Sequence, residues 1–345
     1  MEAGNLLSFA VGLAAGYLGI QRFRADDLSG KTVLITGGSK GLGFVLARDF
    51  ARMGCPVAIC ARDEEELDIA RRRLEDEDAQ VVTGVCDVAD QAQVDRFVGE
   101  VAEAFGPVDI LVNNAGIIQV GPVENLDVDD FEMAMDTMFW GVLHPTRAVL
   151  PQMLARGEGR IVNITSIGGK VSVPHLLPYC CAKFAAVGFS EGLRAEMAGR
   201  GVDIITIAPG LMRTGSHVNA LFKGKRDEEF TWFSMGAGLP MISMNVERAA
   251  RRIIAATKRG SAERVLSAPA KLLSWFHGLL PGTTTKMMGA INRLVLPSAD
   301  GAHQRAEPGS EVYDTLDDDA RSLLDTFAAL GQKATEQFQN LSRRR

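Results

Sequence analysis

The sequence predicts an α/β fold built on a doubly wound parallel sheet. Apolar runs of strand length alternate along the chain with longer runs of helical period. The first apolar run, residues 31–36, passes directly into a glycine-rich turn and then into a helix. Two later runs, 108–112 and 161–166, end in small polar residues. Such endings are typical of the carboxyl edge of a parallel sheet, where ligands bind.

Length and composition bound the class of protein. With 345 residues, 46% of them hydrophobic, the chain is long enough for one large domain with additions. Its formal net charge is −6, and it contains no basic stripe interleaved with aromatic residues, so we predict no nucleic-acid partner. The five cysteines lack a Cys-x-x-Cys spacing, which disfavours a zinc site and a disulfide framework. We therefore expect reduced thiols and no metal site.

The N-terminal segment is a candidate membrane anchor. Residues 3–20 carry no charge, and roughly 18 helical residues just span a hydrocarbon core of about 30 Å. Arg22, Arg24 and Lys31 follow the segment, which favours a cytoplasmic catalytic body on a membrane-associated protein. The alternatives are a helix that lies in the interface or docks on a partner, a cleaved signal, and a soluble cytoplasmic protein.

The glycine turn, 37–43, predicts a dinucleotide site. Its glycines let the backbone approach a pyrophosphate, and the following helix begins with the positive end of its dipole. The next strand, 56–60, is followed by Arg62 where an acidic residue would favour the ribose hydroxyl of NAD. Lys40 places a second cation within the turn. Two cations suit the 2′-phosphate, so we predict NADP (NADPH) as the cofactor.

The following elements alternate in the same way. Residues 63–78 read as a solvated outer helix, 81–85 as a third strand, and 94–105 as an amphipathic helix. Asp87 lies just after the third strand, where it can meet the adenine amino group. Asp90 instead has the spacing of a cap for the next helix.

Three side chains between residues 161 and 197 suit carbonyl chemistry. Tyr179 and Lys183 are four residues apart on a predicted helix and therefore share one face. A nearby ammonium group lowers the pKa of a phenol toward neutrality, which lets Tyr179 exchange a proton with a carbinol or carbonyl oxygen. Ser166, at the end of strand 161–166, supplies a hydroxyl that can bind the same oxygen.

Together these motifs resemble the short-chain dehydrogenase/reductase family over about residues 30–268. The resemblance implies a single Rossmann-type domain with about seven strands, Tyr179 as general acid/base, Lys183 on the nicotinamide ribose, and Ser166 orienting the substrate oxygen. It also implies that a segment after the sixth strand, 202–207, holds the nicotinamide. The predicted catalytic residues are Ser166, Tyr179 and Lys183, and the predicted cofactor-binding residues are Gly37, Ser39, Lys40, Gly41, Leu42, Gly43, Arg62, Asp87, Asn114, Ala115, Gly116, Tyr179, Lys183, Pro209, Gly210 and Thr214.

One position departs from the family pattern. Met138 stands where family members usually carry an asparagine that helps to hold a water in a proton relay to the lysine. A thioether does not donate a hydrogen bond, although the backbone carbonyl of Met138 remains able to hold the water. We expect the chain to retain activity.

The rest of the chain predicts a cover and two additions. Residues 211–246 are rich in glycine, methionine and aromatic residues, which either face a lipophilic substrate or only pack a lid helix. His175 either touches substrate or is solvated. We divide the chain into an anchor segment (1–25), a catalytic domain (26–268), an apolar helical extension (269–297), and a linker with an amphipathic C-terminal helix (298–345). The extension is either a second membrane contact or a flap over the substrate entrance.

The predicted function is NADP(H)-dependent interconversion of a lipophilic ketone and a secondary alcohol by hydride transfer. The resemblance also implies a homo-oligomer. The alternative is a noncatalytic nucleotide-binding scaffold or redox-sensing member of the family, which Met138 and the long C-terminal extension favour. An epimerase or dehydratase of nucleotide sugars is disfavoured, because the apolar cover lacks the charges that a diphosphate needs.

Overall fold

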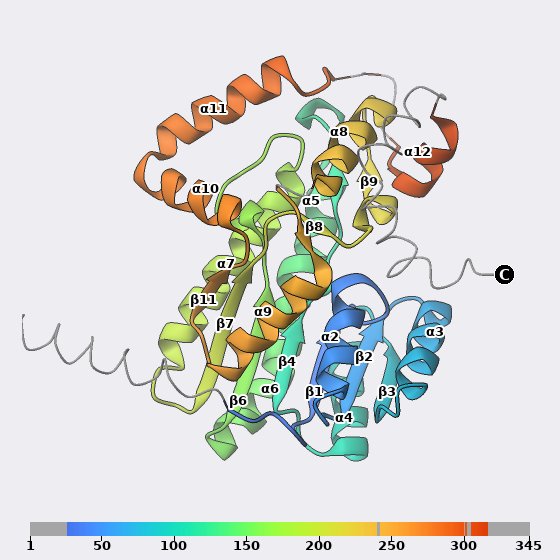
Figure 1. The fold of residues 1–345 in the computed structure, drawn as a ribbon, viewed down its shortest axis with the longest axis vertical. Helices are drawn as coiled ribbons and strands as arrows, with labels where there is room; N and C mark the ends of the chain where they lie inside the picture. Colours follow the sequence, from blue (N-terminus) through green and yellow to red (C-terminus); the bar gives the residue numbers. More distant parts are fainter. Residues whose placement is uncertain (1–25, 240–241, 300, 302–304, 317–345) are drawn as a thin grey trace, which may run out of the picture.

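Seven parallel strands form the central sheet of the computed structural model, which describes residues 26–239, 242–299, 301 and 305–316 (Figure 1). Their order is β11-β7-β6-β4-β1-β2-β3, so the winding reverses between β1 and β4. This arrangement confirms the predicted fold class. The strands are β1 (Val33–Thr36), β2 (Val57–Ala61), β3 (Val81–Val85), β4 (Ile110–Asn113), β6 (Gly159–Ile164), β7 (Val202–Ala208) and β11 (Glu263–Val265).

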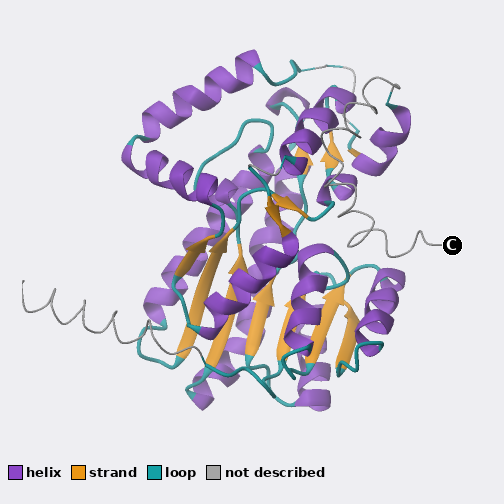
Figure 2. Ribbon diagram, viewed as in Figure 1, coloured by secondary structure: helices purple, strands orange, loops and turns teal. Residues whose placement is uncertain are grey.

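Helices cover both faces of this sheet (Figure 2). One face packs against α2 (Gly41–Ala51), α3 (Glu64–Glu75) and α9 (Val246–Lys258). The other packs against α4 (Gln91–Phe105), α6 (Gly141–Arg156) and α7 (Leu177–Glu196). Because both faces are covered, the central strands are apolar throughout, and every residue of β1 is buried. The strand ends that face upward in Figure 1 form the edge on which the candidate site lies.

Capping side chains fix where two helices of the nucleotide-binding half begin. Asp63 accepts a hydrogen bond from the backbone nitrogen of Glu66 at the start of α3. Asp90 accepts from the backbone nitrogens of Ala92 and Gln93 at the start of α4, as its spacing predicted. These caps set the directions in which the loops after β2 and β3 leave the sheet.

A second, smaller layer stands above that edge. β5 (Gln119–Val120), β9 (Leu221–Phe222) and β12 (Glu307–Pro308) pair into a three-stranded sheet, with α8 (Arg226–Gly238) and α12 (Gly309–Thr315) packed on it. Its core contains Phe222, Phe230, Phe233 and Val312, all buried. The three aromatic side chains therefore pack the cover rather than the cleft. β12 and α12 also differ from the linker expected from residue 298 onward, because Glu307 and Pro308 pair with β9 and α12 packs on α8.

The remaining described elements connect or extend this frame. They are η1 (Val123–Asn125), α5 (Val128–Met135), η2 (Asp136–Trp140), η3 (Ile167–Gly169), β8 (Met212–Arg213), η4 (Ser216–Asn219), β10 (Met244–Asn245), α10 (Ala268–Leu279) and α11 (Pro281–Leu294). The predicted anchor, residues 3–20, and the predicted C-terminal helix, 317–341, lie outside the described residues. Among those that the structure describes, no helix combines the length and apolar character needed to cross a bilayer.

His217 makes the cover sensitive to acid. Its side chain is buried in η4 against the Phe230 ring, and burial lowers its pKa to about 4. The folded protein keeps this imidazole neutral, whereas the unfolded chain protonates it near pH 6.5. Stability is therefore lost as the pH falls from about 6.5 toward 4, because the unfolded state binds the proton first.

We expect His217→Gln to reduce this acid sensitivity. Between pH 7 and 4.5 the wild-type free energy of unfolding should fall by about 2 kcal/mol more than that of the variant. Urea titrations at both pH values measure the difference. If the free energy of unfolding falls equally in the two proteins, His217 is not held neutral by burial in the folded state.

Candidate active site

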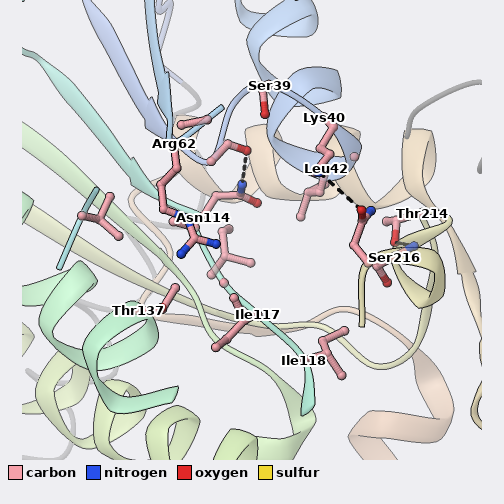
Figure 3. A pocket seen from close by; sticks show the side chains of 18 of the residues that line it. Ser39, Lys40, Leu42, Arg62, Asn114, Ile117, Ile118, Thr137, Thr214 and Ser216 are labelled. Carbon is pink, nitrogen blue, oxygen red and sulfur yellow. Dashed lines mark hydrogen bonds between the residues drawn. The ribbon is translucent and has the colours of Figure 1, made fainter. Parts of the chain in front are cut away.

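A cleft of about 610 Å³ lies along the carboxyl edge of the central sheet, on both sides of the point where the winding reverses (Figure 3). It brings together predicted residues from five loops and from α7, which are far apart in the sequence. The predicted residues that line it are Gly37, Ser39, Lys40, Gly41, Leu42, Arg62, Asp87, Asn114, Ala115, Gly116, Tyr179, Lys183 and Thr214. One cleft thus holds most of the predicted cofactor and catalytic residues.

The glycine turn between β1 and α2 has the shape of a pyrophosphate cradle. Gly37 has a φ of 64°, a conformation that favours glycine. A Cβ at Gly43 would lie 2.1 Å from the carbonyl oxygen of Gly37, so only glycine fits there. The first turn of α2 contains no acidic residue, and the Lys40 side chain does not cap it. Its backbone N–H groups and the helix dipole therefore suit a phosphate.

Asn114 locks this turn to the neighbouring strand. Its side-chain Nδ2 donates to the carbonyl oxygens of Thr36 and Gly37, each at 3.0 Å. Its backbone nitrogen donates to Oγ1 of Thr36, also at 3.0 Å. The amide thus provides hydrogen bonds for backbone carbonyl groups at the end of β1 and just beyond it. It also holds together the ends of β1 and β4, which form the floor of the cleft.

A buried chain of polar side chains positions α7 against the sheet. Asn113 donates to Asn163 at 2.8 Å, Asn163 donates to Ser190 of α7 at 2.9 Å, and the Ser190 hydroxyl bonds that of Thr206 at 2.7 Å. All four side chains are essentially inaccessible to water. Buried hydrogen bonds of this kind fix one arrangement, since a shift would leave polar groups unpaired. The chain therefore fixes the placement of Tyr179 and Lys183.

Tyr179 and Lys183 face the cleft from the first turns of α7, and Ser166 stands beside the phenol. The Ser166 hydroxyl lies close enough to the Tyr179 phenol to oppose the rise of its pKa. Ser166 Oγ also accepts from the backbone nitrogen of Gly168 at 3.0 Å, which orients the hydroxyl. Lys183 Nζ donates to the carbonyl oxygen of Ile164 at 2.9 Å. The structure therefore brings the three predicted catalytic side chains together.

The electrostatics of this group differ from the sequence-based expectation. Burial raises the pKa of Tyr179 to about 12, with hydrogen bonding to Ser166 opposing the rise. Burial likewise lowers the pKa of Lys183 to about 8. The ammonium lies 5.8 Å from the centre of the phenol ring and is bonded elsewhere, so its attraction does not overcome the cost of desolvation. The phenol is consequently protonated at neutral pH.

Met138 closes the rear of the site. It is fully buried in η2, where it packs with Ala182 and Tyr179. A Cβ placed on Gly116 would lie 3.7 Å from Met138 Sδ and 3.8 Å from Lys183 Nζ. Met138 is therefore a neighbour of the lysine amine, at the place expected from the sequence, and it offers no side-chain hydrogen bond there.

The predicted 2′-phosphate site contains a carboxylate that sequence reasoning missed. Lys40 Nζ forms an ion pair with Glu66 Oε1 at 2.6 Å and lies 3.4 Å from Asn219 Oδ1. Ser39 Oγ donates to the other oxygen of Glu66 at 3.2 Å. Glu66 follows the Asp63 cap by three residues, and this spacing is the signal that places it in the first turn of α3. Arg62 is exposed, and its guanidinium points into the cleft in Figure 3.

Several predicted residues support the cleft without lining it. Gly43 lies beneath the glycine turn, and Ser166 stands behind Tyr179. The carbonyl oxygen of Pro209 accepts from the backbone nitrogen of Ile167 at 2.7 Å, and Gly210 packs against Ser267. Residues that line the cleft without having been predicted as site residues include Glu66, Ile117, Ile118, Thr137, Met212, Ser216 and Asn219.

His175 is buried rather than solvated. Its Nδ1 lies 2.7 Å from Oε1 of Glu229, a carboxylate with no exposed surface. The other oxygen of Glu229 accepts from Trp232 Nε1 at 2.6 Å. This pairing joins the loop between Ser166 and Tyr179 to α8 and holds the loop beneath the cover.

Comparisons with known proteins agree with this geometry. The sequence model of the short chain dehydrogenases matches residues 31–222. A dehydrogenase/reductase SDR family protein 7-like of Anopheles gambiae is 40% identical over 202 residues, which are 57% of this chain and 64% of the relative. A Streptomyces coelicolor protein named as a ketoacyl reductase is 37% identical over 186 residues, 53% of this chain and 71% of the relative.

A solved structure shares the fold. The gluconate 5-dehydrogenase of Burkholderia cenocepacia, crystallised with NADP and tartrate, superposes with a TM-score of 0.62 at 30% identity. The match covers 74% of this chain and 99% of that chain.

Proposed function

Because the chain belongs to the short-chain dehydrogenase/reductase family of NAD(P)-dependent oxidoreductases, we propose that it interconverts a lipophilic ketone and a secondary alcohol with NADP(H). The observation that carries the proposal is the placement of Ser166, Tyr179 and Lys183 in or beside the same cleft as the glycine turn. A phosphate-binding turn and a hydroxyl pair at one sheet edge suit a nicotinamide cofactor and a carbonyl oxygen.

The residues of the cleft fit a dinucleotide. Gly37, Gly41 and the first turn of α2 would hold the pyrophosphate, Asp87 the adenine, and Asn114 to Gly116 the wall beside the nicotinamide half. The cofactor would supply the hydride. Lys183 would bind the nicotinamide ribose, with its amine held in place by the Ile164 carbonyl.

Tyr179 would act as the general acid in reduction. A phenol whose pKa is about 12 carries its proton at neutral pH and can give it to a developing alkoxide. Ser166 would bind the same oxygen, since its hydroxyl lies beside the phenol. The protonated phenol is the form that reduction of a ketone requires.

Apolar side chains favour a lipophilic substrate. Ile117, Ile118 and Met212 line the cleft, and none of them can bond the hydroxyl groups of a polar acid. The relative named as a ketoacyl reductase supports a lipophilic ketone, whereas the gluconate dehydrogenase structure points to polar substrates on the same fold. The apolar side chains support the lipophilic ketone in this proposal.

Arg62 tests the cofactor preference. We expect Arg62→Asp to weaken NADPH binding about thirtyfold or more, because a charge-assisted contact with the 2′-phosphate becomes a repulsion. NADH binding should stay within about threefold, since NADH lacks that phosphate. Titrations that follow nicotinamide fluorescence measure both affinities, with exposed Arg72→Asp on α3 as the matched control. Equal losses for NADPH and NADH would contradict the assignment, and a folded wild type that binds neither would contradict the proposed function.

Glu66 is expected to oppose NADPH binding. Its carboxylate engages Lys40 and Ser39, the side chains that would otherwise meet the 2′-phosphate. Glu66→Gln should tighten NADPH binding about fivefold and leave NADH binding unchanged, because a partly exposed ion pair contributes about 1 kcal/mol. The exposed neighbour Glu65→Gln serves as the control. Weaker NADPH binding in the Glu66 variant would show that the carboxylate orders the site instead.

Two further features belong to the proposal. We propose that residues 3–20 attach the protein to a membrane with the catalytic domain on the cytoplasmic side, and that the protein forms a homo-oligomer. The alternative function, a noncatalytic nucleotide-binding scaffold, draws support from buried Met138 beside Lys183. Tight NADPH binding without oxidation of NADPH by any lipophilic ketone would favour that alternative.

A further inference from the structure

Two helices that follow the last strand of the central sheet stand apart from the rest of the molecule. α10 and α11 form a hairpin that extends beyond the sheet edge, at the upper left of Figure 1. Ser267 caps α10 by accepting from the backbone nitrogen of Ala270, and Pro281 begins α11. The hairpin is therefore a built element with defined ends.

The outer side of this hairpin exposes large apolar side chains. On α10, Leu272, Trp275 and Leu279 lie three or four residues apart and are 64%, 60% and 80% exposed. On α11, Met287 and Leu294 share one face and are 47% and 78% exposed. Two helices that each expose a stripe of large apolar side chains are rare on a protein that contacts only water, and such surfaces mark a contact with a membrane or a partner.

The inner side of the hairpin faces the body of the molecule. Ala270 and Thr284 are buried, and His277 and Met288 are half-buried. Side chains of both helices also wall a cavity of about 400 Å³ against the loop that contains His175. One side of the hairpin therefore faces the body across this cavity, and the hairpin's large exposed apolar side chains are not among those that line it.

The charged residues of the hairpin indicate which kind of surface its exposed apolar side binds. Residues 264–299 contain no aspartate or glutamate, although the whole chain carries a net charge of −6. The basic residues of the hairpin are Lys271, Lys286 and Arg293, all exposed. At helical spacing, Lys286 and Arg293 flank the stripe of Met287 and Leu294, and the Lys271 ammonium lies 4.7 Å from the Trp275 ring centre. Apolar side chains flanked only by cations match an anionic lipid surface.

We propose that α10 and α11 form a membrane-docking hairpin, whose exposed apolar stripes enter the headgroup region of an anionic bilayer while its three cations contact the lipid phosphates. Trp275 and Lys271 would lie at the interface, where amphipathic side chains are favoured. This contact is separate from residues 3–20 and from the nucleotide cleft, and it holds whether or not the proposed reaction is correct.

The test uses the full chain with an environment-sensitive label at the tip of the hairpin. Leu279→Cys is made in a Cys181→Ser background, because Cys181 is the exposed thiol among the five cysteines and the others are buried. An NBD label is attached at 279, and a control label at Glu103→Cys on α4. The labelled proteins are mixed at low concentration with vesicles of phosphatidylcholine alone or with phosphatidylglycerol added.

The proposal predicts a blue-shifted, stronger emission from the label at 279 with the anionic vesicles, and no change from the label at 103. Lys286→Glu with Arg293→Glu should weaken the emission change about tenfold or more, because each cation near the surface contributes to binding. The pair Arg96→Glu and Arg200→Glu alters the net charge equally at exposed positions and should change little.

Three results would overturn the proposal. One is vesicle binding that leaves the label at 279 unchanged, which would assign attachment to another segment. A second is an emission shift without vesicles, which would show that the hairpin is covered by a second copy or by this chain's own residues. A third is an equal effect of the two charge-reversal pairs, which would show that the attraction to the vesicles depends only on the net charge of the protein.

Discussion

Tyr179→Phe is expected to lower the rate of ketone reduction about a thousandfold while NADPH binds within about threefold of wild type. The change removes one oxygen atom, the proton donor, and keeps the ring that packs with Met138 and Ala182. Tyr179 is half-buried at the wall of the cleft, and its phenol is protonated at neutral pH, so the substitution removes the group that carries the proton. The measurement is single-turnover oxidation of bound NADPH with trans-1-decalone, a bicyclic lipophilic ketone.

Tyr313 offers a matched control for the same substitution. It is a half-buried tyrosine on α12, away from the nucleotide cleft. Its ring packs on that of Phe230, with 6.2 Å between the two ring centres. Tyr313→Phe should leave the rate within about twofold. Full turnover in Tyr179→Phe would show that this residue is not the proton donor. A comparable loss in both variants would indicate damage to the fold rather than to a proton donor.

The sequence carried enough local information to predict the sheet and the floor of the cleft. Strand and helix periods, the glycine turn, and the cap at Asp90 all depend on residues within one turn or one strand of each other. The topology then brings the loop ends together, because parallel strands present their carboxyl ends at one edge. Tyr179 and Asn114 could therefore be assigned to one site before the structure was known.

Interactions between distant segments were harder to predict. Glu66 was interpreted as a surface charge of a solvated helix, yet it meets Lys40 and Ser39 from the preceding loop. The strand pairing of Glu307 with Phe222 joins a short segment without strand periodicity to the cover. The pKa of Tyr179 depends on how strongly folding removes water from the phenol, and spacing within α7 does not reveal that quantity.

Gly43→Ala is expected to have the second large effect, on binding rather than on proton transfer. The added Cβ would lie 2.1 Å from the Gly37 carbonyl oxygen and 2.6 Å from Asn114 Nδ2. The carbonyl oxygen belongs to the backbone and cannot rotate away as the end of a flexible side chain can. The glycine turn must therefore move away from α2. That movement would misplace the N–H groups that face the pyrophosphate, and we expect NADPH affinity to fall about a hundredfold.

Unfolding measurements on Gly43→Ala and on a second glycine variant separate the effect of steric crowding from that of helix propensity. Gly43→Ala should lower the free energy of unfolding by about 2 kcal/mol through overpacking. Gly99→Ala, in the middle of α4 where a Cβ meets nothing within 4 Å, should instead raise it by roughly 0.5–1 kcal/mol. Urea unfolding and NADPH titration of both variants measure the contrast. If Gly43→Ala binds NADPH as wild type does, the cofactor does not depend on the close approach of α2 to the glycine turn. The pyrophosphate would then have to bind elsewhere in the cleft.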